Sequence, residues 1–293
     1  KTCRQFDAAM ATQGLKWFVW GLFLKVMMAD RLGMYVDQVL DNYMFNSGTS
    51  CILATIYYSF QIYGDFAGYS FMAMGVGKLM GFNLINNFQR PYLSPSITDF
   101  WRRWHISLST WLKDYVYIPL GGSREGAAKT YRNTFFVWLL TGIWHGPDWK
   151  YVTWGLFHGI LIMLSMIFTP YNEKLVQKLH IKTECFSFRL FQMGRTFLLC
   201  CLGRVFFRAD DFASAIGILK RACTGIGWYR LANGRIYNYG LNKANMTVVI
   251  VAMLVLLTVS ILQEKMDVLE ALKKQNLVFR WVLIYALLLA VVI

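Results

Sequence analysis

Hydrophobic residues occur along the chain in long runs that short polar segments interrupt. Three of these runs contain no Asp, Glu, Lys or Arg: Asn42–Gly64, Tyr151–Asn172 and Ala244–Gln263. A helix needs roughly 20 apolar residues to cross the hydrocarbon of a bilayer, so each run predicts a membrane helix. Shorter apolar stretches lie near Gly14–Ala29, Phe66–Leu79, Asn133–Trp144, Leu190–Gly203 and Trp281–Ile293. The pattern predicts about six to eight membrane segments, and the lack of period-two alternation argues against a transmembrane barrel.

Composition supports the same class of protein. Of the 293 residues, 56% are hydrophobic and 16% are charged, whereas soluble domains carry roughly 25% charged residues. Such a chain has too few polar residues to cover its own surface. The same composition excludes an intrinsically disordered chain and a secreted disulfide scaffold. The predicted fold class is therefore an all-α, polytopic membrane protein.

The net charge of +14 lies mainly in the segments that connect the apolar runs. Between Gln89 and Arg132, three acids are outnumbered by seven basic residues: Arg90, Arg102, Arg103, Lys113, Arg124, Lys129 and Arg132. Basic connecting segments are typical of cytoplasmic loops that contact anionic lipid head groups. A second interpretation is a docking face for a phosphorylated donor, such as coenzyme A or an acidic carrier protein. Nucleic-acid binding is disfavoured, because the basic residues form no separate soluble module.

One segment departs from the membrane pattern. Ser96, followed three residues later by Asp99, is typical of a helix start. Aromatic and apolar residues then recur at helical spacing on one face: Trp101, Trp104, His105, Leu108, Trp111, Leu112 and Tyr115. Basic and small polar residues fill the opposite face, and Pro119 ends the pattern. The segment predicts an amphipathic or re-entrant helix near residues 96–118, with His105 on its aromatic face.

A second segment places a histidine at the end of a helix. The apolar run that ends at Trp144 meets His145-Gly146-Pro147-Asp148, and another apolar run follows at once. Glycine and proline end helices, so the first helix is predicted to stop at His145. If the break lies at membrane depth, its freed backbone groups need protein or a water-filled cavity around them. The alternative is an ordinary surface turn with an exposed histidine.

Two more ionisable residues lie in apolar surroundings. His158 follows Trp154 by one helical turn, and a hydrogen bond within helix packing is its expected role. Asp65 interrupts an apolar region, and acids inside membranes are paired or functional. An ion pair or a hydrogen bond to a neighbouring helix is therefore expected for Asp65. His180, by contrast, lies in a polar loop.

Two histidines on apolar elements are suited to general-base chemistry. A neutral imidazole can take a proton from a hydroxyl at physiological pH, and the oxygen can then attack a thioester carbonyl. The sequence contains no Gly-x-Ser-x-Gly elbow, no His-x-x-x-His pair and no phosphate-binding glycine loop. The lack of these motifs argues against a serine hydrolase and a nucleotide-binding enzyme. Acids are scarce near His105 and His145, and no metal site is predicted.

Five sequence motifs surround and connect the candidate residues: Trp20–Arg31, Gln61–Tyr69, Phe100–Gly122, Gly142–Gly146 and Trp154–Gly159. Together they resemble the membrane-bound O-acyltransferase family, in the bacterial branch that acetylates alginate or transfers D-alanine to teichoic acid. The resemblance extends from about Leu15 to Ile160 and is looser afterwards, where Arg204–Ala209 also fits. The sequence Ile-Pro-Leu-Gly-Gly at 118–122 favours the alginate type. Gly64 departs from the pattern, since a bulkier residue is expected there.

The resemblance implies a helical membrane fold around a central tunnel. It implies that His145 is catalytic and that His105 is the second tunnel residue. Five further residues are expected to line the substrate tunnel: Trp101, Trp104, Trp144, Asp65 and His158. Residues 1–293 are expected to form a single membrane domain of this family. This domain would be a fragment that lacks N-terminal membrane helices.

The implied function is O-acyl transfer, in particular O-acetyl transfer from a cytoplasmic thioester toward an extracytoplasmic polysaccharide or partner protein. The donor is expected to be acetyl-coenzyme A or an acyl carrier protein, with no permanently bound cofactor. Expected partners are membrane lipid and an extracytoplasmic acyltransferase, and the expected location is the bacterial cytoplasmic (inner) membrane, crossed several times. Alternatives are D-alanyl transfer to teichoic acid and a lipid acyltransferase of the same superfamily. A transporter is a weaker alternative, because the sequence shows no internal inverted repeat.

Overall fold

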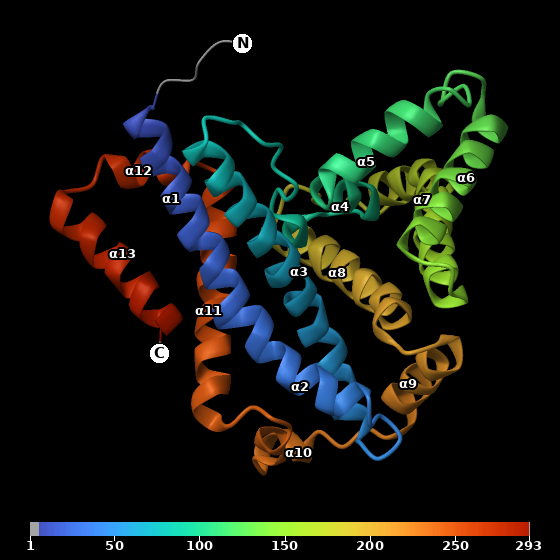
Figure 1. Ribbon diagram of the computed structural model, residues 1–293. Helices are drawn as coiled ribbons and strands as arrows, with labels where there is room; N and C mark the ends of the chain where they lie inside the picture. The colour runs from blue at the N-terminus through green and yellow to red at the C-terminus, as the bar shows by residue number, and fades with distance from the viewer. Residues whose placement is uncertain (1–5, 293) are drawn as a thin grey trace. The chain divides into compact units, whose positions relative to one another are not determined.

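A computed structural model describes residues 6–292 of the chain (Figure 1). The described residues form helices joined by loops, and their one β-type pairing is an isolated bridge between Phe88 and Trp104. This confirms the all-α class. The helices group into two compact units, one made of residues 6–86 and 224–292 and the other of residues 87–223.

The first unit contains two long helical segments and the C-terminal helices. Its elements are α1 (Ala8–Phe23), the π-helical turn η1 (Leu24–Ala29), α2 (Asp30–Leu40), α3 (Gly48–Leu79), α10 (Tyr229–Ala232), the 3-10 turn η4 (Arg235–Asn238), α11 (Lys243–Gln263), α12 (Val268–Lys273) and α13 (Leu277–Val292). In Figure 1, α1 and α3 lie side by side, and their residues are in contact. Glycines permit this approach, because a Cβ on Gly75 would lie 2.5 Å from the carbonyl oxygen of Gly14. Small residues at such crossings are typical of helices that pack inside membranes.

Helix α3 joins two stretches that the sequence pattern predicted as separate segments. Asn42–Gly64 and Phe66–Leu79 were divided at Asp65, but α3 runs from Gly48 to Leu79 without a break. The expectation of two segments here was wrong. Within the continuous helix, Asp65 has a partner on the adjoining element: Lys25 Nζ lies 2.6 Å from Asp65 Oδ1 and 2.7 Å from Asp30 Oδ1.

The second unit carries most of the predicted site. Its elements are the 3-10 turn η2 (Pro91–Leu93), α4 (Ile97–Arg103), α5 (Ile106–Leu112), the π-helical turn η3 (Lys113–Tyr117), α6 (Ala127–His145), α7 (Trp149–Lys178), α8 (Phe186–Arg208) and α9 (Phe212–Thr224). Lys150 joins the start of α7 to the end of α8, since its Nζ donates to the carbonyl oxygens of Ala209 at 2.7 Å and Asp210 at 3.0 Å.

Three of the described helices are long and apolar enough to cross a membrane: α7, α8 and α11. A shorter apolar helix covers Leu277–Ala290. These helices agree with a membrane protein. The larger number of segments that the sequence pattern predicted stays a prediction.

The predicted helix near 96–118 is not continuous, which corrects the sequence analysis. It starts as expected, because Ser96 Oγ accepts a hydrogen bond from the backbone of Asp99 at 3.1 Å. It then breaks at Trp104, which is extended, and at His105, which is left-handed with φ 48°. The break is stable because a distant segment takes its backbone hydrogen bonds: Gln89 N donates to Arg103 O at 2.9 Å and Ile106 N donates to Asn87 O at 3.1 Å.

Helices α6 and α7 pack through glycines. A Cβ on Gly155 would lie 2.5 Å from the carbonyl oxygen of Trp138 and 2.9 Å from the Cα of Gly142. Neither neighbour is a flexible side-chain end, so the two backbones can approach this closely only without a side chain at 155.

We expect Gly155→Ala to lower the free energy of unfolding by about 1–3 kcal/mol, because the added methyl group forces α6 and α7 apart. Thermal unfolding of the purified protein in detergent measures this change. Gly194→Ala on α8 is the matched control, since a Cβ there meets nothing within 4 Å. Equal unfolding temperatures for Gly155→Ala and Gly194→Ala would show that the glycine contact does not hold the two helices together.

Candidate active site

His145 is the last residue of α6, as the sequence pattern predicted. Gly146 follows with φ 155°, and a Cβ there would lie 2.7 Å from the ring of Tyr151. Asp148 then starts α7, because its Oδ1 accepts a hydrogen bond from Lys150 N at 2.8 Å. The Gly-Pro-Asp sequence therefore ends one helix and begins the next within three residues, and it leaves His145 at the corner between them.

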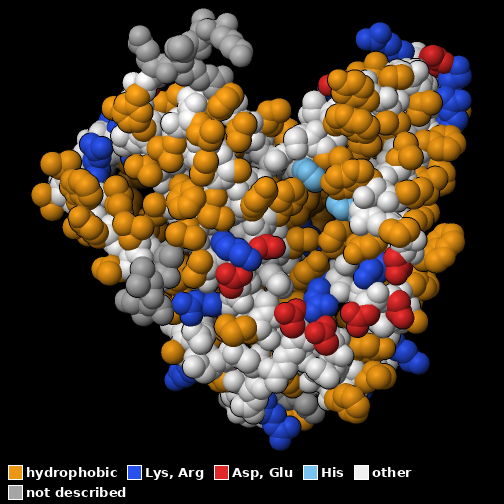
Figure 2. All heavy atoms as spheres, viewed as in Figure 1, with side chains coloured by type: hydrophobic (Ala, Val, Ile, Leu, Met, Phe, Trp, Pro, Cys, Tyr) orange, Lys and Arg blue, Asp and Glu red, His pale blue; other side chains and the backbone are white. Residues whose placement is uncertain are grey.

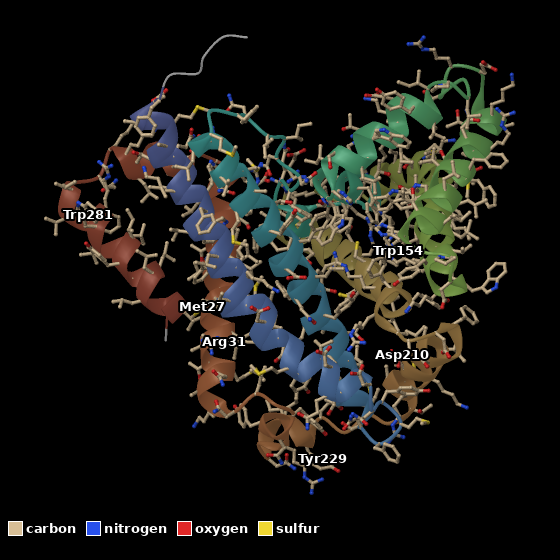
Figure 3. The ribbon with its side chains drawn as sticks, in the orientation of Figure 1. Met27, Arg31, Trp154, Asp210, Tyr229 and Trp281 are labelled. Atoms are coloured by element: carbon tan, nitrogen blue, oxygen red, sulfur yellow. The ribbon has the colours of Figure 1, made fainter. Side chains whose placement is uncertain are left out.

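Aromatic rings surround the half-buried imidazole of His145. The centroid of its ring lies 4.8 Å from that of Trp144, 4.9 Å from that of Trp154 and 5.2 Å from that of Phe207. Figure 3 labels Trp154, which belongs to α7. Within residues 6–292, no hydrogen bond or ion pair engages this imidazole. Its position is set by packing.

His105 comes to the same place from the break between α4 and α5. Its ring centroid lies 6.0 Å from the ring of Trp144, which is also in contact with His145. The Trp144 side chain is 59% exposed. The structure thus brings His105, Trp144 and His145 together, although 40 residues of sequence separate the two histidines. Figure 2 shows two histidine side chains at the molecular surface, next to hydrophobic side chains.

Both histidines lie outside the three candidate spans, and burial favours their neutral forms. Burial lowers the pKa of His105 to about 4. Burial also lowers the pKa of His145 to about 4, and the positive charge of a protonated His105 acts in the same direction. A neutral imidazole is the form that can accept a proton from a hydroxyl.

His158 has the helix-packing role that the sequence analysis expected. It is 1% exposed, and its Nδ1 accepts a hydrogen bond from Trp101 Nε1 at 3.4 Å. Gly203 of α8 packs against the other ring nitrogen, where a Cβ would lie 2.6 Å from His158 Nε2. The ring centroid of Trp101 also lies 5.6 Å from that of Trp154, so Trp101 packs against one of the rings that contact His145. That Trp101 and His158 line a substrate tunnel stays a prediction.

Trp104 is buried beside a charged residue that the sequence analysis did not single out. The guanidinium of Arg204 lies 4.7 Å from the ring of Trp104, 5.3 Å from that of Tyr92 and 5.5 Å from that of Phe100. Its Nη1 donates to the Tyr92 hydroxyl at 3.1 Å. Cation–π contacts of this kind offset part of the cost of burying an arginine. Arg204 is the one charged residue between Thr196 and Phe207 in α8, and this isolated charge was the available signal for it.

Asp65 belongs to the first unit. Its ion pair with Lys25 confirms the pairing that we expected for an acid in an apolar region. Its carboxylate is 56% exposed. A place for Asp65 in a substrate tunnel stays a prediction.

Sequence reasoning missed two residues that contact His145 directly. Trp154 was noted as part of a motif, and Phe207 as part of a looser one, but neither was assigned to the site. The rings of Trp154 and Phe207 also contact each other at 5.3 Å. Because Phe207 lies 62 residues after His145, no local spacing indicates that the two meet.

A comparison with family models matches residues 4–207 to the model of the membrane-bound O-acyltransferase family. The matched range contains every site residue described above. It extends through most of the second unit and into the first.

Comparison with curated proteins finds bacterial relatives. A probable alginate O-acetylase of Pseudomonas syringae pv. tomato is 41% identical over 244 residues, which cover 83% of this chain and 43% of that protein. A peptidoglycan O-acetyltransferase of Helicobacter pylori is 40% identical over 207 residues, or 71% of this chain and 38% of that protein. A teichoic acid D-alanyltransferase of Bacillus subtilis is 33% identical over 145 residues, or 47% of this chain and 34% of that protein. The chain spans less than half the length of these relatives.

Asn87 is expected to stabilise the break between α4 and α5, where His105 lies. Its Oδ1 accepts a hydrogen bond from Ser107 N at 3.0 Å, in addition to the bond that its backbone oxygen accepts. Asn87→Ala removes the side-chain acceptor and is expected to lower the free energy of unfolding by about 0.5–2 kcal/mol. Asn87→Asp keeps an acceptor oxygen and should unfold closer to the wild type in a thermal melt. If the alanine variant is as stable as the aspartate variant, the side chain does not hold this break.

Proposed function

The chain belongs to the membrane-bound O-acyltransferase family, and from this we propose that the full-length protein is an O-acetyltransferase. It would move an acetyl group from a thioester to an acceptor hydroxyl, and from there the group would pass toward a cell-envelope or secreted polysaccharide or a partner protein. The observation that carries the proposal is the meeting of His105 and His145 at Trp144, inside the region that matches the family. The names of the two relatives near 40% identity support acetyl as the acyl group.

His145 is the proposed general base. Its neutral imidazole takes the proton of the acceptor hydroxyl while the hydroxyl oxygen attacks the thioester carbonyl. The tetrahedral intermediate collapses with cleavage of the carbon–sulfur bond. The proton then passes from the imidazolium to the departing sulfur, so that the products are an oxygen ester and a free thiol. Atoms and charge balance without a metal or a redox group, and no permanently bound cofactor is needed.

His105 is the proposed second functional residue. From its position beside Trp144 it would orient or polarise the donor or the acceptor. The aromatic residues Trp101, Trp104 and Trp144 would line a passage that excludes water. In such surroundings hydrogen bonds and charges act more strongly than in bulk solvent. The donor in this proposal is a cytoplasmic thioester of coenzyme A or of an acyl carrier protein.

The proposed location is the bacterial cytoplasmic (inner) membrane, which the protein would cross several times. The apolar helices α7, α8 and α11 support this placement. The basic segment between Gln89 and Arg132 would contact anionic lipid or the phosphorylated donor. A second acyltransferase on the outer side is proposed to receive the acyl group, since a cytoplasmic donor and an external polysaccharide lie on opposite sides of the bilayer.

D-alanyl transfer to teichoic acid is the second candidate. Its support is the similarity to the D-alanyltransferase of Bacillus subtilis, at 33% identity over 47% of this chain. The two candidates differ in the thioester that is consumed, so the identity of the consumed donor distinguishes them.

We expect His145→Ala to lower acetyl transfer by roughly 10²–10⁴-fold, because the general base is lost. The measurement is the base-labile acetate on envelope or secreted polysaccharide, in cells that produce the full-length protein or the variant at equal levels. His180→Ala is the matched control, because His180 lies exposed in the turn after α7. Equal acetate in the wild type and His145→Ala would show that His145 is not the base, or that acetyl is not the group transferred. D-alanine esters, measured in the same samples, separate these two results.

The pH dependence of acetyl transfer should reflect the lowered pKa of both histidines. A pKa near 4 keeps the imidazoles neutral as the pH falls from 7.5 to 6. A histidine of ordinary pKa, about 6.5, would be about three-quarters protonated at pH 6. We therefore expect kcat/KM with a thioester donor, which reports the ionisation of the free enzyme, to stay nearly constant over this range and to fall only at lower pH. A decline centred near pH 6.5 would contradict the buried, neutral state of the base.

A further inference from the structure

Among the described residues, no acid pairs with His145, whereas a histidine base usually has such a partner. In a serine protease, a buried carboxylate holds the imidazole in one orientation and stabilises the imidazolium that forms. The acid nearest in sequence to His145 is Asp148, and its Oδ1 is engaged with Lys150 N at the start of α7. Some other group must perform these two tasks if His145 is to act as a base.

Three aromatic rings from three helices pack around the imidazole of His145. The ring planes of Trp144, Trp154 and Phe207 meet that of His145 at 78°, 88° and 82°. These side chains come from α6, α7 and α8 in turn. Trp154 and Phe207 also contact each other, and Tyr151 packs on Phe207 at 5.3 Å. The imidazole is thus held by nearly perpendicular rings whose own positions are fixed by their neighbours.

We propose that Trp154 and Phe207 are positioning residues that orient His145 and stabilise the imidazolium it becomes during acyl transfer. The inference rests on the proposed function, because it concerns the proton that His145 takes from the acceptor. It also gives a role to Arg204–Ala209, a segment whose resemblance to the family had no chemical explanation.

The physical basis is the charge distribution of an aromatic ring. Its face is electron-rich and its edge is electron-poor, so an edge-to-face contact is favourable and strengthens when the edge belongs to a cation. In the proposed contact, the edge of the His145 imidazole faces the ring of Phe207. A neutral imidazole gains little from this contact and an imidazolium gains more. The contact therefore favours the charged intermediate over the resting state, which is the condition for raising kcat.

Fluorination of one ring separates this role from simple packing. Mono-, di- and trifluorinated phenylalanine at position 207 progressively weaken the negative face of the ring with little change in its shape. In the full-length protein we expect kcat for acetyl transfer to fall stepwise, by roughly two- to thirtyfold across the series, while KM for the donor changes little. This range is a cation–π contribution of about 0.5–2 kcal/mol, converted at 1.4 kcal/mol per tenfold.

Phe206 is the matched control. It is the neighbouring residue on α8, and its ring stacks on Phe212 at 5.9 Å. The same fluorinated series at position 206 should leave kcat unchanged. Fluorinated tryptophans at position 154 give a second series, which keeps the proposal testable if a variant at 207 fails to fold.

Each outcome of the fluorinated series either supports or overturns the role proposed for Phe207. A stepwise fall at 207 with constant kcat at 206 supports the proposal. A flat series at 207 means that the ring only fills space, and a rising series means that its edge faces His145; either result overturns the proposal. If the wild-type protein transfers no acyl group, or if His145→Ala retains full activity, the proposed function fails first. Those two controls distinguish the failure of the function from the failure of this inference.

Discussion

The close approach of α6 and α7 at Gly142 and Gly155 is the constraint on which the candidate site depends. Because the two backbones almost touch there, α7 must return directly along α6 after the Gly146-Pro147-Asp148 turn. Trp154, the neighbour of Gly155, is thereby brought against His145. A wider separation of the helices would leave the imidazole at a helix end with little to fix its direction. The position of the histidine is thus a consequence of helix packing rather than of the turn alone.

The same packing principle recurs on α8. Gly203 lets this helix approach the buried ring of His158, and Phe207, four residues later, reaches His145. Lys150, at the start of α7, also joins the two helices, because its Nζ donates hydrogen bonds to the carbonyl oxygens of Ala209 and Asp210 just after α8. The aromatic residues, 17% of the chain, are large and rigid, so that they fill the space between closely packed helices and leave little freedom to the imidazole.

Local signals predicted the features that neighbouring residues decide. Ser96 and Asp99 indicated where α4 begins, and Gly146 with Pro147 indicated where α6 ends. The break at His105 was missed, because its backbone partners lie at Asn87 and Gln89, beyond the range of any helical spacing. The continuity of α3 through Asp65 was also missed, and the residue that pairs with Asp65, Lys25, lies 40 residues away, where no local spacing indicates it. The motifs identified both candidate histidines, but only the fold shows that Trp154 and Phe207 surround one of them.

The hairpin of α7 and α8 is tied firmly at one end. The contacts of Lys150, Trp154 and His158 join the first third of α7 to the end of α8 and the residues just after it, whereas the turn at residues 179–185 is largely exposed. Exposed turns with few contacts are the places where chains accept inserted sequence. An epitope placed in this turn would therefore report which side of the membrane it occupies, in a protein whose candidate site is undisturbed. The two helices that pack around His145 thus also carry an exposed turn in which the membrane topology of the protein can be mapped.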